Sequence, residues 1–341
     1  MNGPAVGQHL WIGVAGMELN EANRRLLHSI QPGGVVLFGR NVESAKQLRS
    51  FTRALKREIP SAPLIAIDHE GGRVNRLRPI LGELPTVAEL KKSGRASAAR
   101  AFGRKTGQAL RRLGIEVNFA PVLDLELFAA DADNGLRDRC WGKTAAEVTR
   151  WAGAFIDGLQ AAGIPACPKH FPGIGAALTD SHDRLPTIHR SRAELAREDV
   201  RVFAELLPRV GAVMVGHGHY PDVQGEKPQP ASLSPVIVGQ LLRRRLGFAG
   251  LVVTDDLEMG AVTTGRSIGE ATVEALAAGA DLALICHSPE KILSAHESLT
   301  RAVEAGRVEL ARLGEAQVRI RCFAARWACG KGSAGGEARS R

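Results

Sequence analysis

Acidic residues and histidines gather directly after short apolar runs at four places in the sequence. The four segments are IDHEGGRVNRL (67–77), KHFPGIGAALTDSH (169–182), GHGHYPD (216–222) and VTDDLEMGA (253–261). A fixed carboxylate can act as a nucleophile, and an imidazole close to it can donate and accept protons. Cleavage of a glycoside with retention of configuration needs one group of each kind on either side of the scissile bond. These segments are therefore the first candidates for an active site.

The strongest nucleophile candidate is Asp255. It follows the apolar run 251–253, which predicts a strand whose end holds the carboxylate rigidly. An alternative role is capping of a helix that begins before Leu257 and Met259. Asp256 fits that cap better, so we interpret Asp255 as the catalytic carboxylate.

A second candidate is the triplet Asp180-Ser181-His182. In an extended segment, residues two apart point to the same side, so this carboxylate and this imidazole can face each other. The carboxylate would then orient the ring and stabilise its protonated form. An Asp-x-His triplet alone is a weak signal, but its combination with Asp255 predicts an acid/base pair.

Polar residues that suit the hydroxyls of a sugar lie near these candidates. Lys169 and His170 follow a predicted strand, Arg139 lies in the preceding loop, and Asp68 is placed to accept hydrogen bonds from such groups. The alternative is a buried network of structural ion pairs. Four histidines could in principle form a metal site: His170, His182, His217 and His219. No recognised ligand spacing supports such a site, and we expect no metal.

Short β-type runs alternate with longer helical stretches along the chain, a pattern typical of parallel strands joined by helices. The predicted strands are 10–14, 34–38, 64–67, 115–119, 164–168, 212–216, 250–254 and 281–285. The predicted helices include 43–57, 94–113, 145–162, 192–207, 235–245 and 288–305. Eight such units predict an α/β fold, a single TIM-type (β/α)8 barrel with its active site at the carboxyl ends of the strands.

The barrel is expected to form one catalytic domain over residues 1–329. Residues 308–329 predict a last amphipathic helix that closes the bottom of the barrel or packs on its side. The low-complexity tail 330–341 is expected to be disordered. The segment 171–190 is long and rich in glycine and ionisable residues, which favours a mobile functional loop.

Composition narrows the class of protein. The chain has 341 residues, five widely spaced cysteines and a net charge of +9, without a block of like charge. We expect no nucleic acid as a partner and no disulfide framework. We also expect no membrane partner, since no apolar run approaches the roughly 18 residues of a membrane span. No secretory signal is visible at the start, so we expect a cytoplasmic protein. We also expect a monomer.

Several motifs together resemble glycoside hydrolase family 3, in its single-domain β-N-acetylhexosaminidase branch. They are DHEGGRVNRL, KHFPGIGAALTDSH, PASLSP and LGFAGLVVTDDLEMGAV, and the resemblance spans about residues 10 to 300. The Asp-Ser-His element is its most specific part. Related glucosidases take their acid/base carboxylate from a second domain. We expect no such domain in this short chain, and the resemblance implies that the loop supplies the acid instead. Three departures are His69 in place of the usual glutamine, Ile174 in place of a frequent second histidine, and DRCWG at 138–142 in place of DRSFG.

The resemblance implies roles for individual residues. Asp255 matches the nucleophile, His182 the acid/base and Asp180 its paired carboxylate. Five further residues match those that bind the N-acetylglucosamine ring: Asp68, Arg76, Arg139, Lys169 and His170. The implied reaction needs no cofactor and releases N-acetylglucosamine from 1,6-anhydro-N-acetylmuramic acid, with or without its peptide, during cytoplasmic recycling of the cell wall. Such muropeptides are anionic, which suits the basic charge.

Three other functions remain open. Lys169 at a strand end suits a Schiff-base aldolase. A catalytically silent sugar-binding barrel is a second alternative, although it would not need Asp255, Asp180 and His182. A broad β-glucosidase differs only in how it handles the 2-acetamido group.

Overall fold

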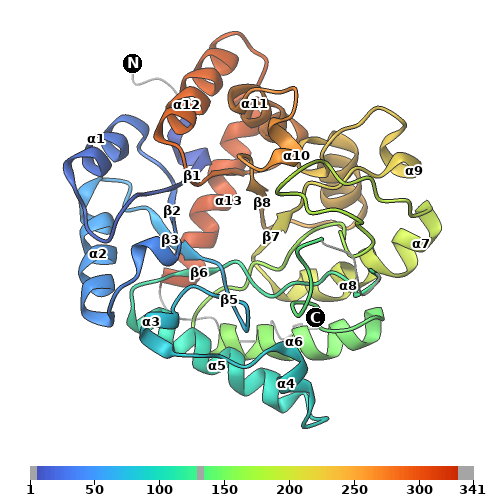
Figure 1. Ribbon diagram of the computed structural model, residues 1–341. Coiled ribbons are helices and arrows are strands. Elements are labelled where there is room, and N and C mark those ends of the chain that lie inside the picture. Colours follow the sequence, from blue (N-terminus) through green and yellow to red (C-terminus); the bar gives the residue numbers. More distant parts are fainter. Residues whose placement is uncertain (1–5, 129–133, 329–341) are drawn as a thin grey trace, which may run out of the picture.

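The computed structural model describes residues 6–128 and 134–328. Its main sheet has seven parallel strands in the spatial order β6-β3-β2-β1-β9-β8-β7. In chain order the strands are β1 (Leu10–Gly13), β2 (Gly34–Leu37), β3 (Leu64–Ile67), β6 (Val117–Asn118), β7 (Ala212–Val215), β8 (Leu251–Asp256) and β9 (Leu282–Ile285). The sheet curls, so the carboxyl ends of its strands converge on one opening (Figure 1).

Helices surround the outer face of the curled sheet (Figure 1). The longer ones are α1 (Glu21–Ile30), α2 (Ala45–Glu58), α5 (Ser97–Arg112), α6 (Ala145–Ala161), α8 (Asp199–Leu206), η5 (Pro235–Arg245), α11 (Ile268–Ala278) and α12 (Pro289–Glu304). The short ones include α3 (Arg78–Leu81), α4 (Val87–Lys91), α7 (Arg192–Arg197), α9 (Pro221–Gln224) and α10 (Gly260–Thr263). Side-chain caps fix where several begin: Ser44 caps α2 and Thr144 caps α6, each by accepting a backbone N–H that the helix itself leaves unpaired.

Strand residues alternate between two separate cores, because successive side chains of a strand point to opposite faces. In β1, Leu10 and Ile12 pack outward among the helices, whereas Trp11 packs inside the curled sheet. The interior core is aromatic at its centre, where the Trp11 and Phe119 ring centroids lie 5.7 Å apart. This interior is a packed core, and it forms the floor beneath the site.

The prediction of an α/β fold with parallel strands and intervening helices is confirmed, but the predicted strand at 164–168 is wrong. Pro165 and Pro168 lack the N–H that a regular ladder requires, so this stretch forms no regular strand, although Ala166 bridges to β6 and the following Phe171 bridges to β7. The Cys167 backbone N–H still donates to the Asn118 carbonyl, and the Pro168 carbonyl accepts the Met214 backbone N–H, each over 2.9 Å. The regular sheet therefore has seven strands. A two-stranded hairpin that we did not predict, β4 (His69–Gly71) with β5 (Val74–Asn75), follows β3.

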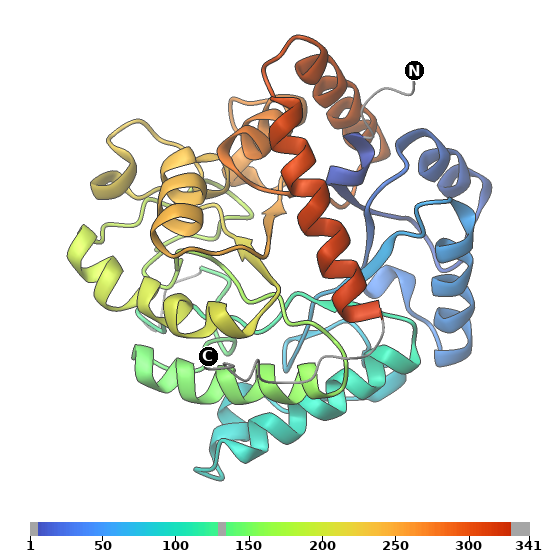
Figure 2. The same cartoon turned by 180° about the vertical axis from the view of Figure 1, so that it is seen from behind.

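The last predicted helix is present as α13 (Leu310–Ala328). It crosses the side of the sheet away from the converging carboxyl ends (Figure 2). Ile320, Phe323 and Trp327 join the interior core, so the helix covers the bottom of the curled sheet, one of the two placements we expected. The predicted tail 330–341 lies outside the described residues. Within 6–128 and 134–328, the structure contains no helix long and apolar enough to cross a bilayer.

Candidate active site

The carboxylate of Asp255 stands at the carboxyl end of β8, which pairs with β7 on one side and β9 on the other. Its side chain is 20% exposed. It opens into a cavity of about 220 Å³ whose wall also includes Asp68, Arg76 and His182. The cavity therefore brings three of the predicted site residues, from other segments of the chain, together with the predicted nucleophile.

Positive groups hold Asp255 in its charged form. Burial by itself raises the pKa of this carboxyl, but His170, His217 and Lys169 lower it, and the net pKa lies below its ordinary value. The backbone N–H of Asp256 also donates to Asp255 Oδ1 over 2.8 Å. An ionised carboxylate is the state that a nucleophile requires.

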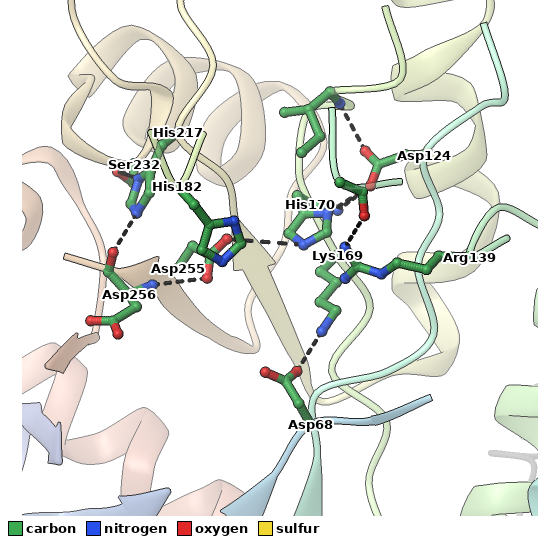
Figure 3. Close-up of polar contacts among 12 residues, drawn as sticks. Asp68, Asp124, Arg139, Lys169, His170, His182, His217, Ser232, Asp255 and Asp256 are labelled. Atoms are coloured by element: carbon green, nitrogen blue, oxygen red, sulfur yellow. Dashed lines mark hydrogen bonds and ion pairs between the residues drawn. The ribbon is translucent and has the colours of Figure 1, made fainter. Parts of the chain in front are cut away.

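The predicted pair Asp180 and His182 is formed. His182 Nδ1 lies 2.7 Å from Asp180 Oδ1, and the same oxygen accepts the His182 backbone N–H over 2.9 Å. This hydrogen bond raises the pKa of His182 despite its partial burial. The imidazole is 69% exposed, and it points toward Asp255 across the cavity (Figure 3). The pair can therefore hold and release a proton above the nucleophile.

The loop that carries this pair is fastened to the chain segment after β8. The backbone N–H groups of Gly260 and Ala261 donate to the carbonyls of His182 and Ser181, over 2.8 and 3.1 Å. A Cβ added to Gly260 would lie 2.2 Å from the carbonyl oxygen of Asp183, so only glycine allows this approach. The position of Ser181 and His182 is thus fixed by the segment that follows the predicted nucleophile.

A buried ion network fills one side of the site. The ammonium of Lys169 contacts Asp68 Oδ1 and lies 2.7 Å from Glu70 Oε1. Arg139 binds the same Glu70 with two hydrogen bonds of 2.9 and 2.8 Å. Burial by itself raises the pKa of Glu70, but the two cations hold it well below its usual range. The ion-pair network that we weighed as an alternative is therefore present, centred on a residue we did not predict.

The same contacts bear on the aldolase alternative. Burial lowers the pKa of Lys169, but Asp68 and Glu70 raise it beyond that effect, to a net value above the ordinary one. An iminium-forming lysine must lose its proton to act as a nucleophile. Lys169 is therefore in the wrong state for Schiff-base chemistry.

His170 lies between two carboxylates. Its Nδ1 is 2.6 Å from Asp124 Oδ2, and its Nε2 faces Asp255 Oδ2 at 3.9 Å (Figure 3). Asp124 is fully buried. The sequence reasoning missed Asp124, although its position soon after the predicted strand 115–119 was a signal that could have found it.

Arg76 enters the cavity from the β4–β5 hairpin. Its guanidinium carbon lies 5.8 Å from the centroid of the Phe38 ring, and Arg40 approaches the same ring at 4.5 Å. The buried Nε of Arg76 has no hydrogen-bond partner in the described structure.

The histidines of the possible metal site have other partners. His217 Nδ1 lies 2.8 Å from Ser232 Oγ, and its Nε2 lies 3.0 Å from the carbonyl of Asp256. The nearest contact of His219 Nδ1 is the backbone N–H of Gln229, at 3.4 Å. Among the residues that the structure describes, no three His, Cys, Asp or Glu side chains are grouped to hold a metal ion.

The model of the glycosyl hydrolase family 3 N-terminal domain matches residues 5–322. A β-hexosaminidase of Idiomarina loihiensis is 34% identical over 282 residues, covering 82% of this chain and 83% of that protein. Among solved structures, a family 3 β-N-acetylglucosaminidase from Paenibacillus sp. str. FPU-7 superposes with a TM-score of 0.90 at 36% identity. It covers 98% of this chain, which spans 64% of that longer one.

NagZ from Neisseria gonorrhoeae, in complex with N-trifluoroacetyl-D-glucosamine, superposes with a TM-score of 0.76 at 30% identity over 92% of this chain and 97% of its own. The family resemblance inferred from the motifs is thereby confirmed. The prediction of a glycoside hydrolase of the β-N-acetylhexosaminidase type is confirmed by the same matches. This chain belongs to glycosyl hydrolase family 3.

Proposed function

We propose that this enzyme is a retaining β-N-acetylglucosaminidase of peptidoglycan recycling. Its substrate is N-acetylglucosamine linked to 1,6-anhydro-N-acetylmuramic acid, with or without the peptide. The observation that carries the proposal is the meeting of Asp255 and His182 in one cavity, where the pKa of Asp255 is lowered and that of His182 is raised. The net charge of +9 favours an anionic muropeptide.

In the first step, the carboxylate of Asp255 attacks the anomeric carbon and the bond to the leaving sugar breaks. His182 gives its proton to the departing oxygen, and a covalent glycosyl-Asp255 ester forms. In the second step, the now neutral His182 takes a proton from water, which displaces Asp255 and releases the sugar with its original configuration. Asp180 keeps the ring oriented and stabilises its charged form through both steps.

The ion network is proposed to bind the sugar. The carboxylate of Asp68, together with Lys169 and Arg139, presents acceptors and donors suited to neighbouring hydroxyls, and Arg76 lines the same cavity as Asp68. His170 lies next to the proposed nucleophile, with its Nε2 3.9 Å from Asp255 Oδ2. Because Glu70 already balances two cations, these groups are fixed before the substrate arrives.

The remaining expectations stay part of the proposal. The irregular stretch at Ala166–Phe171 takes the place of the eighth strand, so that residues 1–329 act as one (β/α)8 barrel domain; its bridges to β6 and β7 support this. The enzyme works in the cytoplasm as a monomer, without metal or cofactor.

The test compares a chromogenic N-acetyl-β-glucosaminide with the matching β-glucoside, followed by the anhydro-disaccharide as substrate. We expect hydrolysis of the first at least about 100-fold faster in kcat/KM, since discrimination by a site built around one substituent reaches several kcal/mol. Equal rates would favour the broad β-glucosidase. Proton NMR of the sugar released first must show the β-anomer, and an α-anomer would contradict the retaining mechanism.

A further inference from the structure

Asp124 lies beneath the site and makes three hydrogen bonds from a position with no exposed surface. Its Oδ2 accepts from His170 Nδ1 over 2.6 Å and from the His170 backbone N–H over 3.3 Å. Its Oδ1 accepts the backbone N–H of Ile174 over 2.8 Å. Both oxygens are thus occupied by donors from the segment that precedes the Asp180–His182 pair.

These contacts fix the state of the His170 ring. An ionised carboxylate only accepts hydrogen bonds, so the proton of this contact must be on Nδ1. The other ring nitrogen, Nε2, is left facing Asp255 Oδ2 at 3.9 Å, as Figure 3 shows. Asp124 thereby fixes which nitrogen of the His170 ring is turned toward the nucleophile.

We propose that Asp124 is a positioning residue for the glycosidase reaction: one buried carboxylate orients His170 toward Asp255 and anchors the start of the 171–190 loop at Ile174. This inference rests on the proposed role of Asp255. Asp124 touches no reacting atom, and it acts through His170 on the charge of the nucleophile and through Ile174 on the loop.

Other titratable groups near Asp255 and Asp124 can also shift a pH profile, so the test needs a control at one of them. Asp255 is surrounded by titratable groups from several elements: Lys169, His170, His182, His217, Asp256, Cys167 and Cys286. Asp124 in turn contributes to the pKa shifts of four neighbouring groups: Arg139, Cys140, Asp199 and Tyr220. A matched control is therefore available in Asp199, which is buried but is bonded to Arg190 and not to His170.

The experiment compares Asp124→Asn with Asp199→Asn across pH, using kcat/KM for the chromogenic N-acetyl-β-glucosaminide. In Asp124→Asn we expect a loss of at least about tenfold at the pH optimum, as for other carboxylates that orient a working imidazole. The acid limb should also move to higher pH, because a His170 ring that is no longer held beside Asp255 lowers the pKa of that carboxyl less. Asp199→Asn should keep the wild-type acid limb.

Two further measurements separate the possible outcomes. In a His170→Ala background, Asp124→Asn should cost little more, since the two residues act as one unit. In the wild-type enzyme, ¹⁵N NMR should show the proton of neutral His170 on Nδ1, which needs no destabilised variant. A neutral ring protonated on Nε2, an unmoved acid limb, or additive losses would overturn the inference.

The failure of the proposed function itself has a different signature. A fluorinated glycosyl fluoride should label wild-type Asp255 covalently, and mass spectrometry locates the label. A label on another residue contradicts the nucleophile assignment whatever Asp124→Asn does. A label on Asp255 with a wild-type pH profile in Asp124→Asn contradicts only the role of Asp124.

Discussion

Asp255 and His182 line the same cavity but reach it from supports of different kinds. Asp255 ends a strand that is hydrogen-bonded on both sides, and its carboxylate is 20% exposed. His182 lies in a loop between α6 and α7, where the structure has isolated bridges and turns, and its ring is 69% exposed. One group is held by the sheet, and the other by a few local contacts.

This difference matches what each group must do in the proposed mechanism. A nucleophile attacks one carbon at one distance, so a rigid strand end lowers the entropic part of the barrier. An acid must reach the oxygen of a leaving group that enters and departs, which an exposed loop allows. The loop is still not free, because Gly260 and Ala261 fasten it to the segment that follows the nucleophile.

The largest effect is expected at the rigid support. Asp255→Ala should lower kcat by at least about 1,000-fold, equivalent to about 4 kcal/mol of lost transition-state stabilisation. Thermal unfolding should change little, because the removed carboxylate faces a cavity. The control is Asp222→Ala, an exposed aspartate of α9, which should keep wild-type kcat. A variant that keeps more than about a tenth of wild-type kcat would show that Asp255 is not the nucleophile.

At the loop, the loss should depend on the leaving group. His182→Ala should slow hydrolysis of the natural disaccharide by about 100- to 10,000-fold, the usual contribution of general acid–base catalysis. The glycosylation step of activated aryl glycosides should be less impaired, because their leaving groups depart without a proton. His28→Ala, an exposed histidine on α1, is the control. Equal losses for both substrates would point to another proton donor.

Replacing Asp180, the partner of His182, should lower kcat/KM less than replacing His182 and should also shift its pH dependence. The hydrogen bond from Asp180 raises the pKa of His182, so Asp180→Asn should lower that pKa. The protonated acid then disappears at lower pH, and the basic limb of kcat/KM for the disaccharide should move downward. Combining this change with His182→Ala should not add its full loss. An unchanged basic limb would separate Asp180 from the acid.

The backbone contacts between Gly260 and the loop that carries His182 can be disturbed without removing any of the proposed catalytic side chains. Gly260→Ala places a methyl group against the backbone of His182 and Asp183, and the loop must move. We expect about a tenfold lower kcat/KM for the disaccharide, since small misplacements of catalytic groups are costly. Labelling of Asp255 by the fluorinated reagent should persist. Gly314→Ala in α13, where no atom lies near the added methyl group, is the matched control.

The smallest effect on catalysis is expected at the opposite end of the sheet. Phe323→Ala in α13 removes a ring that is 5% exposed in the interior core. It should lower the free energy of unfolding by about 3 kcal/mol, as is usual for such truncations. The kcat should stay close to wild type. The exposed neighbour Cys322, changed to alanine, should alter neither quantity, and a large loss of kcat in Phe323→Ala would mean that the two ends are coupled.

The sequence was sufficient for those parts of the fold and site that have a local signal. Strand runs such as 251–253, the last helix and the Asp180–His182 pair depend on periodicity or on spacing within a few residues, and all are found in the structure. The strand predicted at 164–168 was wrong because the prediction followed the apolar pattern and gave too little weight to Pro165 and Pro168, which interrupt the ladder of backbone hydrogen bonds.

The contacts that the sequence did not reveal join distant segments. Glu70 meets Arg139 and Lys169 from other loops, and Asp124 meets His170 forty-six positions later. Whether a carboxylate after a strand serves a sugar, an ion pair or an imidazole depends on which loops converge, and that is set by the curl of the sheet. Both residues follow predicted strands, where site residues were expected, but no nearby sequence pattern indicated their partners.

The placement of α13 has a consequence for how this protein is made. Phe323 and Trp327, near the end of the chain, cover interior residues that begin with Trp11, near its start. A nascent chain still lacking the helix exposes that aromatic interior to solvent, whatever the strands have already achieved. We therefore expect folding to finish only when synthesis has delivered residues 310–328 from the ribosome, and a premature stop before them leaves Asp255, Asp180 and His182 in a chain without the helix that covers its interior core.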